Sequence, residues 1–237
     1  MLARLLYRAF SQPLLTLRLA RPGRLKKAIL FMFSSRGNLS ELYRRSHEIY
    51  APSGTASVPV REIACKGNKQ KKTILIFPLI DWEHRQQRPQ HLALHLGRRG
   101  YRVVYFSTIP LIDRQPYRIT ARHEENVYVC RLRAGGFRID DIHRDLMSNA
   151  IRDGYAGSLR TFMQDMEIEH PILILHHPYW TPLAQVVPHE RIGYDCMDHH
   201  RGFFDDAAIG MDASELSLIK AADFVITSSV YLKDKFR

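Results

Sequence analysis

Short runs of apolar residues, each about the length of a buried strand, occur along the chain from residue 73 onward. Residues 73–80 read TILIFPLI and residues 102–107 read RVVYFS. Apolar runs of this length predict strands that are buried on both faces. Between them, Pro89 favours the first turn of a helix, and Gly100 stands where a glycine commonly ends one. This order predicts a βαβ unit with parallel strands and a right-handed crossover.

The same alternation of strands and helices continues to the end of the chain. The further strands expected cover residues 126–132, 171–176, 191–195 and 223–228, and the further helices cover about 140–167, 212–221 and 230–236. This pattern predicts an α/β protein with a Rossmann-like, doubly wound and mostly parallel sheet.

The first 72 residues differ from the rest of the chain. In residues 1–50, apolar residues recur at helical spacing between breaks at prolines, which predicts helical pieces. Residues 51–72 combine Pro, Gly and Ser with a lysine-rich run, which predicts a linker. The sequence therefore predicts a basic helical leader over 1–50, a linker over 51–72 and a Rossmann-like domain over 73–237.

The positive charge of the chain belongs to its leader and linker. Residues 1–72 hold 15 Lys and Arg against 3 Asp and Glu, whereas residues 73–237 hold 20 against 21. A nucleic-acid-binding domain carries its positive charge on the folded body, so nucleic acid is not expected as a partner. A basic amphipathic leader suits an anionic membrane surface. A helical pair that packs on the body, or a connector from a longer protein, remains an alternative.

The cysteines and the hydropathy of the chain favour a reducing compartment. Cys65, Cys130 and Cys196 are odd in number and far apart, so they predict no disulfide framework. No apolar run reaches the roughly 18–20 residues that a membrane-spanning helix needs, and arginines interrupt the N-terminal apolar runs. We therefore expect a cytoplasmic protein, peripheral at the inner face of the cell membrane.

Polar and aromatic side chains gather where the predicted strands end. Ligands of open α/β sheets bind outside the carboxyl ends of the strands. The residues at these ends include Asp81, Trp82, Arg85, Arg88, His176, His177, Tyr194, Asp195, Asp198 and Ser228. Carboxylates and imidazoles can bond hydroxyl groups, and aromatic faces pack on sugar rings. This edge of the sheet therefore suits a polyhydroxylated ligand.

The string FPLIDWEHRQQRPQHLALHLGRRGYRVVYFS resembles the opening of a group of bacterial glycosyltransferases related to family 4. In that group a strand is followed by the pattern D-W-x-x-R-x-Q-R-P-Q-x-L. The strings ILILHHPYW, IGYDCMDHH and ADFVITSSVYL resemble the same group's later strand ends, in the same order. The resemblance covers roughly residues 73–237. It implies a GT-B fold, whose N-terminal domain receives the acceptor and whose C-terminal domain holds the nucleotide-sugar.

The resemblance also implies a function. It is the transfer of a sugar from a nucleotide-sugar to a cell-surface polysaccharide or a lipid-linked glycan. The chain stops at Arg237, so we expect only the acceptor half, with the donor bound by a missing or separate domain. Because transfer requires both substrates to be held together, the chain alone is expected to be inactive. One alternative is a non-catalytic Rossmann-like module that pairs with a donor-domain partner. The other is a metal-assisted hydrolase.

The resemblance gives the strand-end residues their expected roles. It implies His176, His177 and Asp198 as catalytic residues, with a neutral histidine as general base. Only one of the two neighbouring histidines should face the cleft, because adjacent strand residues point to opposite sides. The residues implied in acceptor binding are Asp81, Trp82, Arg85, Arg88, Tyr194, Asp195 and Ser228.

Structural roles remain open for the same residues. Asp81 could cap the following helix, Arg85 and Arg88 could pair with acids or phosphate, and a buried histidine could bond backbone. Asp195 and Asp198 could close a turn, and Ser228 with Ser229 could cap the last helix.

Other kinds of site lack their motifs. No GxGxxG follows the first strand, and Gly135-Gly136 is too short to replace it, so no dinucleotide site is expected. No GxSxG elbow of a hydrolase is present. The strand-end histidines His176, His177, His199 and His200 are not joined by an HExxH or HxxxH spacing on one helix, and the resemblance implies a metal-independent enzyme. We therefore expect no cofactor and no metal site.

Overall fold

The structure is a computed structural model that describes residues 72–84, 86–111, 114–123, 126–135, 141–200 and 210–236. All of these belong to the unit Ser57–Arg237. The predicted leader over 1–50, all of the linker except Lys72, and Arg85 lie outside the described residues. The expectations of a membrane-facing leader and of an acceptor contact by Arg85 therefore stay predictions.

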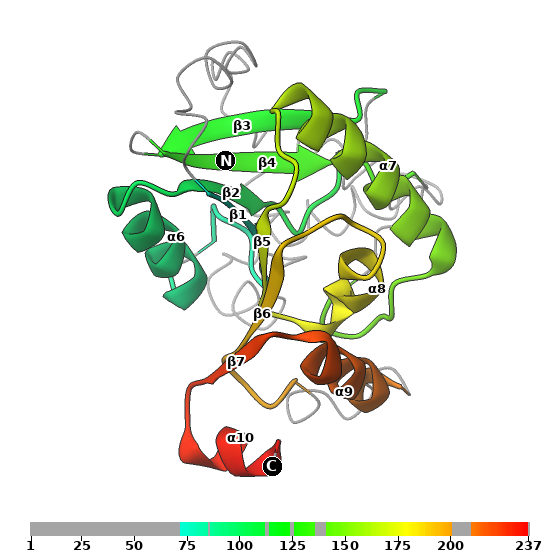
Figure 1. Cartoon of the computed structure of the whole chain (residues 1–237). Helices are drawn as coiled ribbons and strands as arrows, with labels where there is room; N and C mark the ends of the chain where they lie inside the picture. Colours follow the sequence, from blue (N-terminus) through cyan, green and yellow to red (C-terminus); the bar gives the residue numbers. More distant parts are fainter. Residues whose placement is uncertain are drawn as a thin grey trace, which may run out of the picture. The chain divides into compact units, whose positions relative to one another are not determined.

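Seven strands form one sheet in the order β3-β4-β2-β1-β5-β6-β7 (Figure 1). The strands are β1 (Thr73–Phe77), β2 (Arg102–Phe106), β3 (Tyr117–His123), β4 (Val127–Leu132), β5 (Ile172–Leu175), β6 (Arg191–Cys196) and β7 (Phe224–Thr227). Only the edge strand β3 is antiparallel to its neighbour. The other six are parallel, and in chain order they run 3-2-1-4-5-6 across the sheet. This is the strand order of a Rossmann-like fold, and the predicted α/β class is confirmed.

Helices cover both faces of this sheet (Figure 1). In the described residues they are α6 (Arg88–Arg98), α7 (Asn149–Asp165), the 3-10 helix η1 (Pro178–Trp180), α8 (Thr181–Ala184), α9 (Met211–Ala221) and α10 (Val230–Lys235). On one face, Leu75 and Phe77 of β1 pack in a core that includes residues of α7, α8 and α9. On the other face, Ile74 and Ile76 pack against α6. We call these the α7 face and the α6 face.

Helix α6 begins and ends as its sequence predicts. Pro89 lies in its first turn, and the backbone N–H of Gln87 donates to the side chain of Gln90 at 3.1 Å. Gly100 follows the helix with φ +87°, a conformation that favours glycine. The alternative that Asp81 caps this helix is wrong, because Gln87 is the N-cap residue.

Four elements differ from the prediction. Helix α7 begins at Asn149 rather than near residue 140, where the Ser148 side chain accepts a hydrogen bond from the backbone N–H of Ile151. Strand β3 was not predicted, because Ile119 is its only buried residue and an edge strand lacks an apolar run. The short helices η1 and α8 contain too few residues to produce a helical period.

None of the helices in the described part of the chain has the length and apolar character that crossing a membrane requires.

Candidate functional site

The connections of the sheet reverse direction between β1 and β5. These two strands are neighbours, but the chain leaves β1 toward β2 on one side and enters β5 from α7. Ligands of open α/β sheets bind at such a point, outside the carboxyl ends of the strands. The residues that follow β1, β5 and β6 therefore define the candidate site.

An arginine, an aspartate and a histidine meet at this edge on the α6 face. Arg88 begins α6, Asp195 lies near the end of β6 and His176 directly follows β5. The Nε of Arg88 donates to Oδ2 of Asp195 at 3.1 Å, and its Nη2 lies 2.7 Å from Oδ1. The Nε2 of His176 lies 3.3 Å from Oδ2 of the same carboxylate. We call this group the Arg88 cluster.

The members of the Arg88 cluster differ in their access to solvent. The Asp195 side chain is 1% exposed and His176 is fully buried, whereas 41% of the Arg88 side chain is exposed. A guanidinium has five N–H groups in a rigid fork. The contacts to Asp195 occupy the Nε–Nη2 edge of the Arg88 guanidinium. The N–H groups of Nη1 therefore lie away from the Asp195 carboxylate. Asp195 thus holds an arginine whose Nη1 donors lie away from the carboxylate, and the buried ring of His176 lies beside that carboxylate.

Asp81 fixes the loop that precedes Arg88. Its carboxylate is buried and accepts a 2.5 Å hydrogen bond from Oγ of Ser107, the residue that follows β2. Its backbone carbonyl accepts from the side chain of Gln90 at 3.3 Å. Trp82 stacks on His123 of β3, with ring centroids 4.5 Å apart. These contacts tie the loop to the end of β2, to β3 and to α6, so Asp81 and Trp82 support the position of Arg88.

The two neighbouring histidines point to opposite faces, as strand alternation predicts. His176 faces Asp195 on the α6 face. On the α7 face, Nδ1 of His177 accepts from the backbone N–H of Tyr179 at 3.1 Å, and its ring lies 4.4 Å from that of His200. Only His176 therefore belongs to the Arg88 cluster.

Tyr194, Asp198 and Ser228 lie apart from the Arg88 cluster in their contacts. Tyr194 precedes Asp195 and points to the α7 face, where its hydroxyl donates to Glu215 at 2.6 Å. The Asp198 carbonyl accepts from the thiol of Cys196, and Oγ of Ser228 donates to the carbonyl of Met197 at 2.5 Å. Among the described residues, no hydrogen bond or ion pair joins these three to the cluster. Ser229, rather than Ser228, caps α10.

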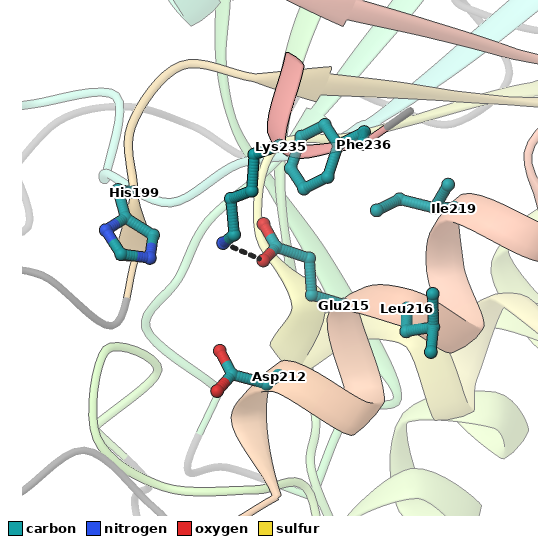
Figure 2. A pocket seen from close by; sticks show the side chains of 7 residues that line it. All are labelled: His199, Asp212, Glu215, Leu216, Ile219, Lys235 and Phe236. Atoms are coloured by element: carbon teal, nitrogen blue, oxygen red, sulfur yellow. Dashed lines mark hydrogen bonds and ion pairs between the residues drawn. The ribbon is translucent and has the colours of Figure 1, made fainter. Parts of the chain in front are cut away.

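A pocket of about 560 Å³ lies between α9 and α10 (Figure 2). Its lining residues are His199, Asp212, Glu215, Leu216, Ile219, Lys235 and Phe236. In Figure 2, Lys235 reaches from α10 to Glu215 of α9, and Oε2 of the carboxylate lies 3.0 Å from its Nζ. Sequence reasoning missed both residues, because neither follows a strand and charged residues are ordinary on helices.

The histidines of the α7 face are held neutral. Burial lowers the pKa of His200 to about 4. Burial, together with the neighbouring His200 and His143, lowers the pKa of His177 well below its ordinary value of 6.5. The folded protein therefore binds these protons less readily than the unfolded chain does.

This difference in pKa between the folded and unfolded states predicts that acid destabilises the folded protein. The stabilisation is present above the ordinary histidine pKa and is lost as the pH falls toward the folded-state pKa, about 4 for His200. We expect His200 alone to lower the free energy of unfolding by about 2 kcal/mol between about pH 7 and pH 5. Urea denaturation at both pH values, with a chelator present so that no metal ion contributes, measures this loss of stability. His200→Gln should show a smaller pH dependence, and an equal one would contradict the prediction.

No protein-family model matches the chain, and no curated protein matches it. The resemblance to glycosyltransferases therefore depends on the sequence motifs alone.

Proposed function

We propose that this chain is the acceptor-side domain of a GT-B glycosyltransferase. The enzyme transfers a sugar from a nucleotide-sugar to a cell-surface polysaccharide or a lipid-linked glycan at the cytoplasmic face of the membrane. The observation that carries the proposal is the Arg88 cluster, in which a buried Asp195 holds an outward-facing arginine beside the β1–β5 reversal. The D-W-x-x-R-x-Q-R-P-Q-x-L motif, which contains Arg88, supports the same assignment.

Each member of the cluster has a role in this proposal. The Nη1 N–H groups of Arg88, which lie away from Asp195, bind oxygen atoms of the acceptor, either hydroxyls or the phosphate or carboxylate of an anionic glycan. Asp195 fixes the orientation of the guanidinium. The ring of His176 is fully buried and its Nε2 lies 3.3 Å from Oδ2 of Asp195, so it acts as a positioning residue that packs beside the carboxylate. Preorganisation of this kind lowers the cost of orienting the acceptor for transfer.

The donor nucleotide-sugar is bound elsewhere in this proposal, by a further domain or a partner. Catalysis then occurs between the two halves, where water is excluded and both substrates are held in reach.

A second candidate is a non-catalytic module that docks to a donor-domain partner. Apolar side chains exposed at the last strand and helix favour it, since Phe224, Val225 and Ile226 of β7 and Val230 and Tyr231 of α10 are all exposed. Contiguous exposed apolar residues mark protein interaction surfaces. Such a surface suits both a docking module and the acceptor half of an assembled enzyme. A measurement of sugar transfer therefore distinguishes these two functions.

The test is an incorporation assay with the full-length gene product. Radiolabelled uridine- and guanosine-diphosphate hexoses are incubated with the protein and with membranes of the source cells, which supply acceptor glycans. We expect label to enter a lipid-linked or polysaccharide fraction with at least one donor. Absence of incorporation with every donor, from protein that is folded by circular dichroism, would exclude the enzyme and leave the docking module.

A further inference from the structure

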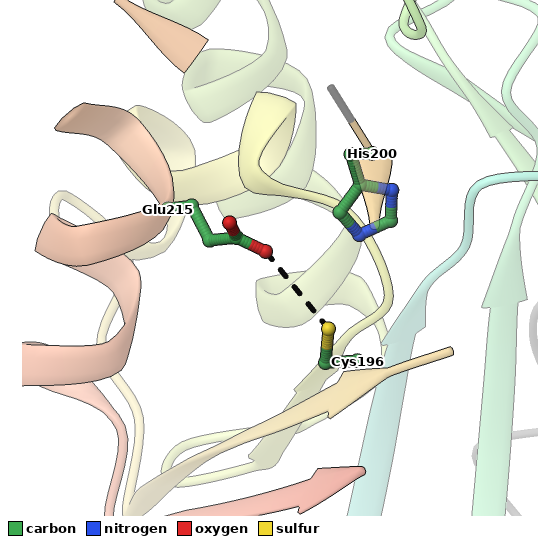
Figure 3. A group of neighbouring side chains, drawn as sticks. All are labelled: Cys196, His200 and Glu215. Atoms are coloured by element: carbon green, nitrogen blue, oxygen red, sulfur yellow. Dashed lines mark hydrogen bonds between the residues drawn. The ribbon is translucent and has the colours of Figure 1, made fainter. Parts of the chain in front are cut away.

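Three metal-ligating side chains of different types meet on the α7 face, behind the end of β6. Cys196 is the last residue of β6, and His200 lies four residues further along the chain. Glu215 comes from α9 (Figure 3). All three residues are buried, and their ligand atoms lie within 4.8 Å of one another. Asp195 points to the other face of the sheet, so this group is separate from the Arg88 cluster.

His200 supplies an independent sign of a missing ligand. It is only 6% exposed, and its Nε2 has no hydrogen-bond partner among the described residues. In Figure 3, the ring nitrogen farther from the backbone points toward the thiol of Cys196 and the carboxylate of Glu215. A buried polar atom without a partner is unfavourable, and the lone pair of a neutral imidazole is a preferred ligand for zinc.

The carboxylate of Glu215 is already oriented by outer partners. Its Oε1 accepts from the hydroxyl of Tyr194 at 2.6 Å and faces the Sγ of Cys196 at 3.9 Å. Its Oε2 is held by the ammonium of Lys235 at 3.0 Å. Metal-ligating carboxylates are commonly hydrogen-bonded in this way by a second layer of residues. An ion pair accounts for Glu215 and Lys235, but among the described residues it leaves Nε2 of His200 without a hydrogen-bond partner.

We propose that Cys196, His200 and Glu215 bind a zinc ion through Sγ, Nε2 and Oε1. Zinc takes thiolate, imidazole and carboxylate ligands at about 2.0–2.3 Å in tetrahedral geometry. Those bond lengths put the ligand atoms roughly 3.5 Å apart, so binding shortens their separations, which are 4.8 Å at most. Three protein ligands leave the fourth position for water. Glu215 also lines the pocket between α9 and α10, which gives this site a neighbouring space.

The protonation states of the metal-free site fit this assignment. Burial lowers the pKa of His200 to about 4, so its ring is neutral and can bind a metal at pH 7. Burial raises the pKa of Cys196 to about 11, so its thiol is protonated without metal. Zinc binds the thiolate, and the thiol proton is released to solvent when the Zn–S bond forms.

The sequence pattern that carries the site is Cys-x-x-x-His at positions 196 and 200. The expectation of no metal site came from the spacing of the strand-end histidines and from the resemblance. The third ligand, Glu215, lies on α9, and no local motif joins it to Cys196 and His200.

The test uses the full chain, purified under reducing conditions and stripped with a chelator. Zn²⁺ is titrated by calorimetry, and Co²⁺ is used as a spectroscopic probe of the same site. We expect one equivalent of zinc, release of a proton, and a thiolate-to-cobalt charge-transfer band. Cys196→Ala should lower zinc affinity by about 100-fold or more and abolish that band. Cys130→Ala is the matched control, because Cys130 is also buried but lies in β4, outside the group.

Three outcomes would overturn the proposal. They are less than one equivalent of zinc, equal affinities for Cys196→Ala and Cys130→Ala, and cobalt binding without a thiolate band. If Cys196→Ala does not fold, Glu215→Gln and His200→Gln decide the question. Glu215→Gln retains an acceptor for Tyr194, and each of these variants should lose zinc affinity by a similar factor.

Discussion

Arg88→Ala is expected to lower the rate of sugar transfer by about 100-fold, the usual cost of removing one preorganised donor from an active site. The Nη1 N–H groups of Arg88 lie away from Asp195 at the β1–β5 reversal, while Asp195 holds the Nε–Nη2 edge of the guanidinium. Arg88→Lys keeps the charge but loses the planar fork, so it should recover little of the activity. The incorporation assay described above measures both effects.

The controls separate function from stability. Arg88→Ala leaves the buried carboxylate of Asp195 without its partner, which also destabilises the fold. The free energy of unfolding must therefore be measured for each variant, and transfer compared under conditions where all are folded. Arg160→Ala, on the exposed side of α7, is the matched arginine control and should retain full activity. If Arg88→Ala is folded and as active as Arg160→Ala, Arg88 does not bind the acceptor.

Gly154→Ala is expected to destabilise the protein by about 2–3 kcal/mol, the cost of overpacking a tight contact. Helix α7 crosses the segment after β4 at Gly154, where an added Cβ would collide with the carbonyl of Ala134 and lie 2.7 Å from the Cα of Gly135. Both obstacles are backbone atoms, so no side chain can move aside. Gly135 itself has φ +69°, and its role is this close approach rather than phosphate binding.

The matched control for this prediction lies one turn further along the same helix. An added Cβ at Gly157 meets no atom within 4 Å. Gly157→Ala should therefore stabilise the protein by about 0.5–1 kcal/mol, because alanine has the higher helix propensity. Urea denaturation of the two variants measures both changes. Equal stabilities would mean that α7 does not approach the segment 134–135 as closely as described.

Elements with an uninterrupted apolar pattern could be predicted from sequence. Strands β1, β2, β4 and β5 lie fully inside the sheet, so almost every residue must be apolar to avoid water. Helix α6 carries its own boundary residues, Pro89 and Gly100. Strand β3 could not be found because one edge and much of both faces meet solvent, and its residues are mostly polar.

The residues of the candidate site could likewise be predicted only in part from the sequence. That Arg88, His176 and Asp195 lie at one edge follows from sequence, because parallel strands bring their carboxyl ends together. Which of these residues meet does not follow, since it depends on the order of the strands. Adjacent His176 and His177 serve different clusters only because β5 is covered on both faces.

The sequence by itself determined the fold class, the helix boundaries marked by proline and glycine, and the strand ends that carry polar groups. Those features arise from local sterics and from burial along one segment. The tertiary structure alone decided that Asp195 holds Arg88 at 2.7 Å, that Glu215 of α9 joins Cys196 and His200, and that Gly154 must lack a side chain. Each of these contacts depends on packing between segments that are far apart in the chain. No local sequence pattern specifies which distant segments will pack together.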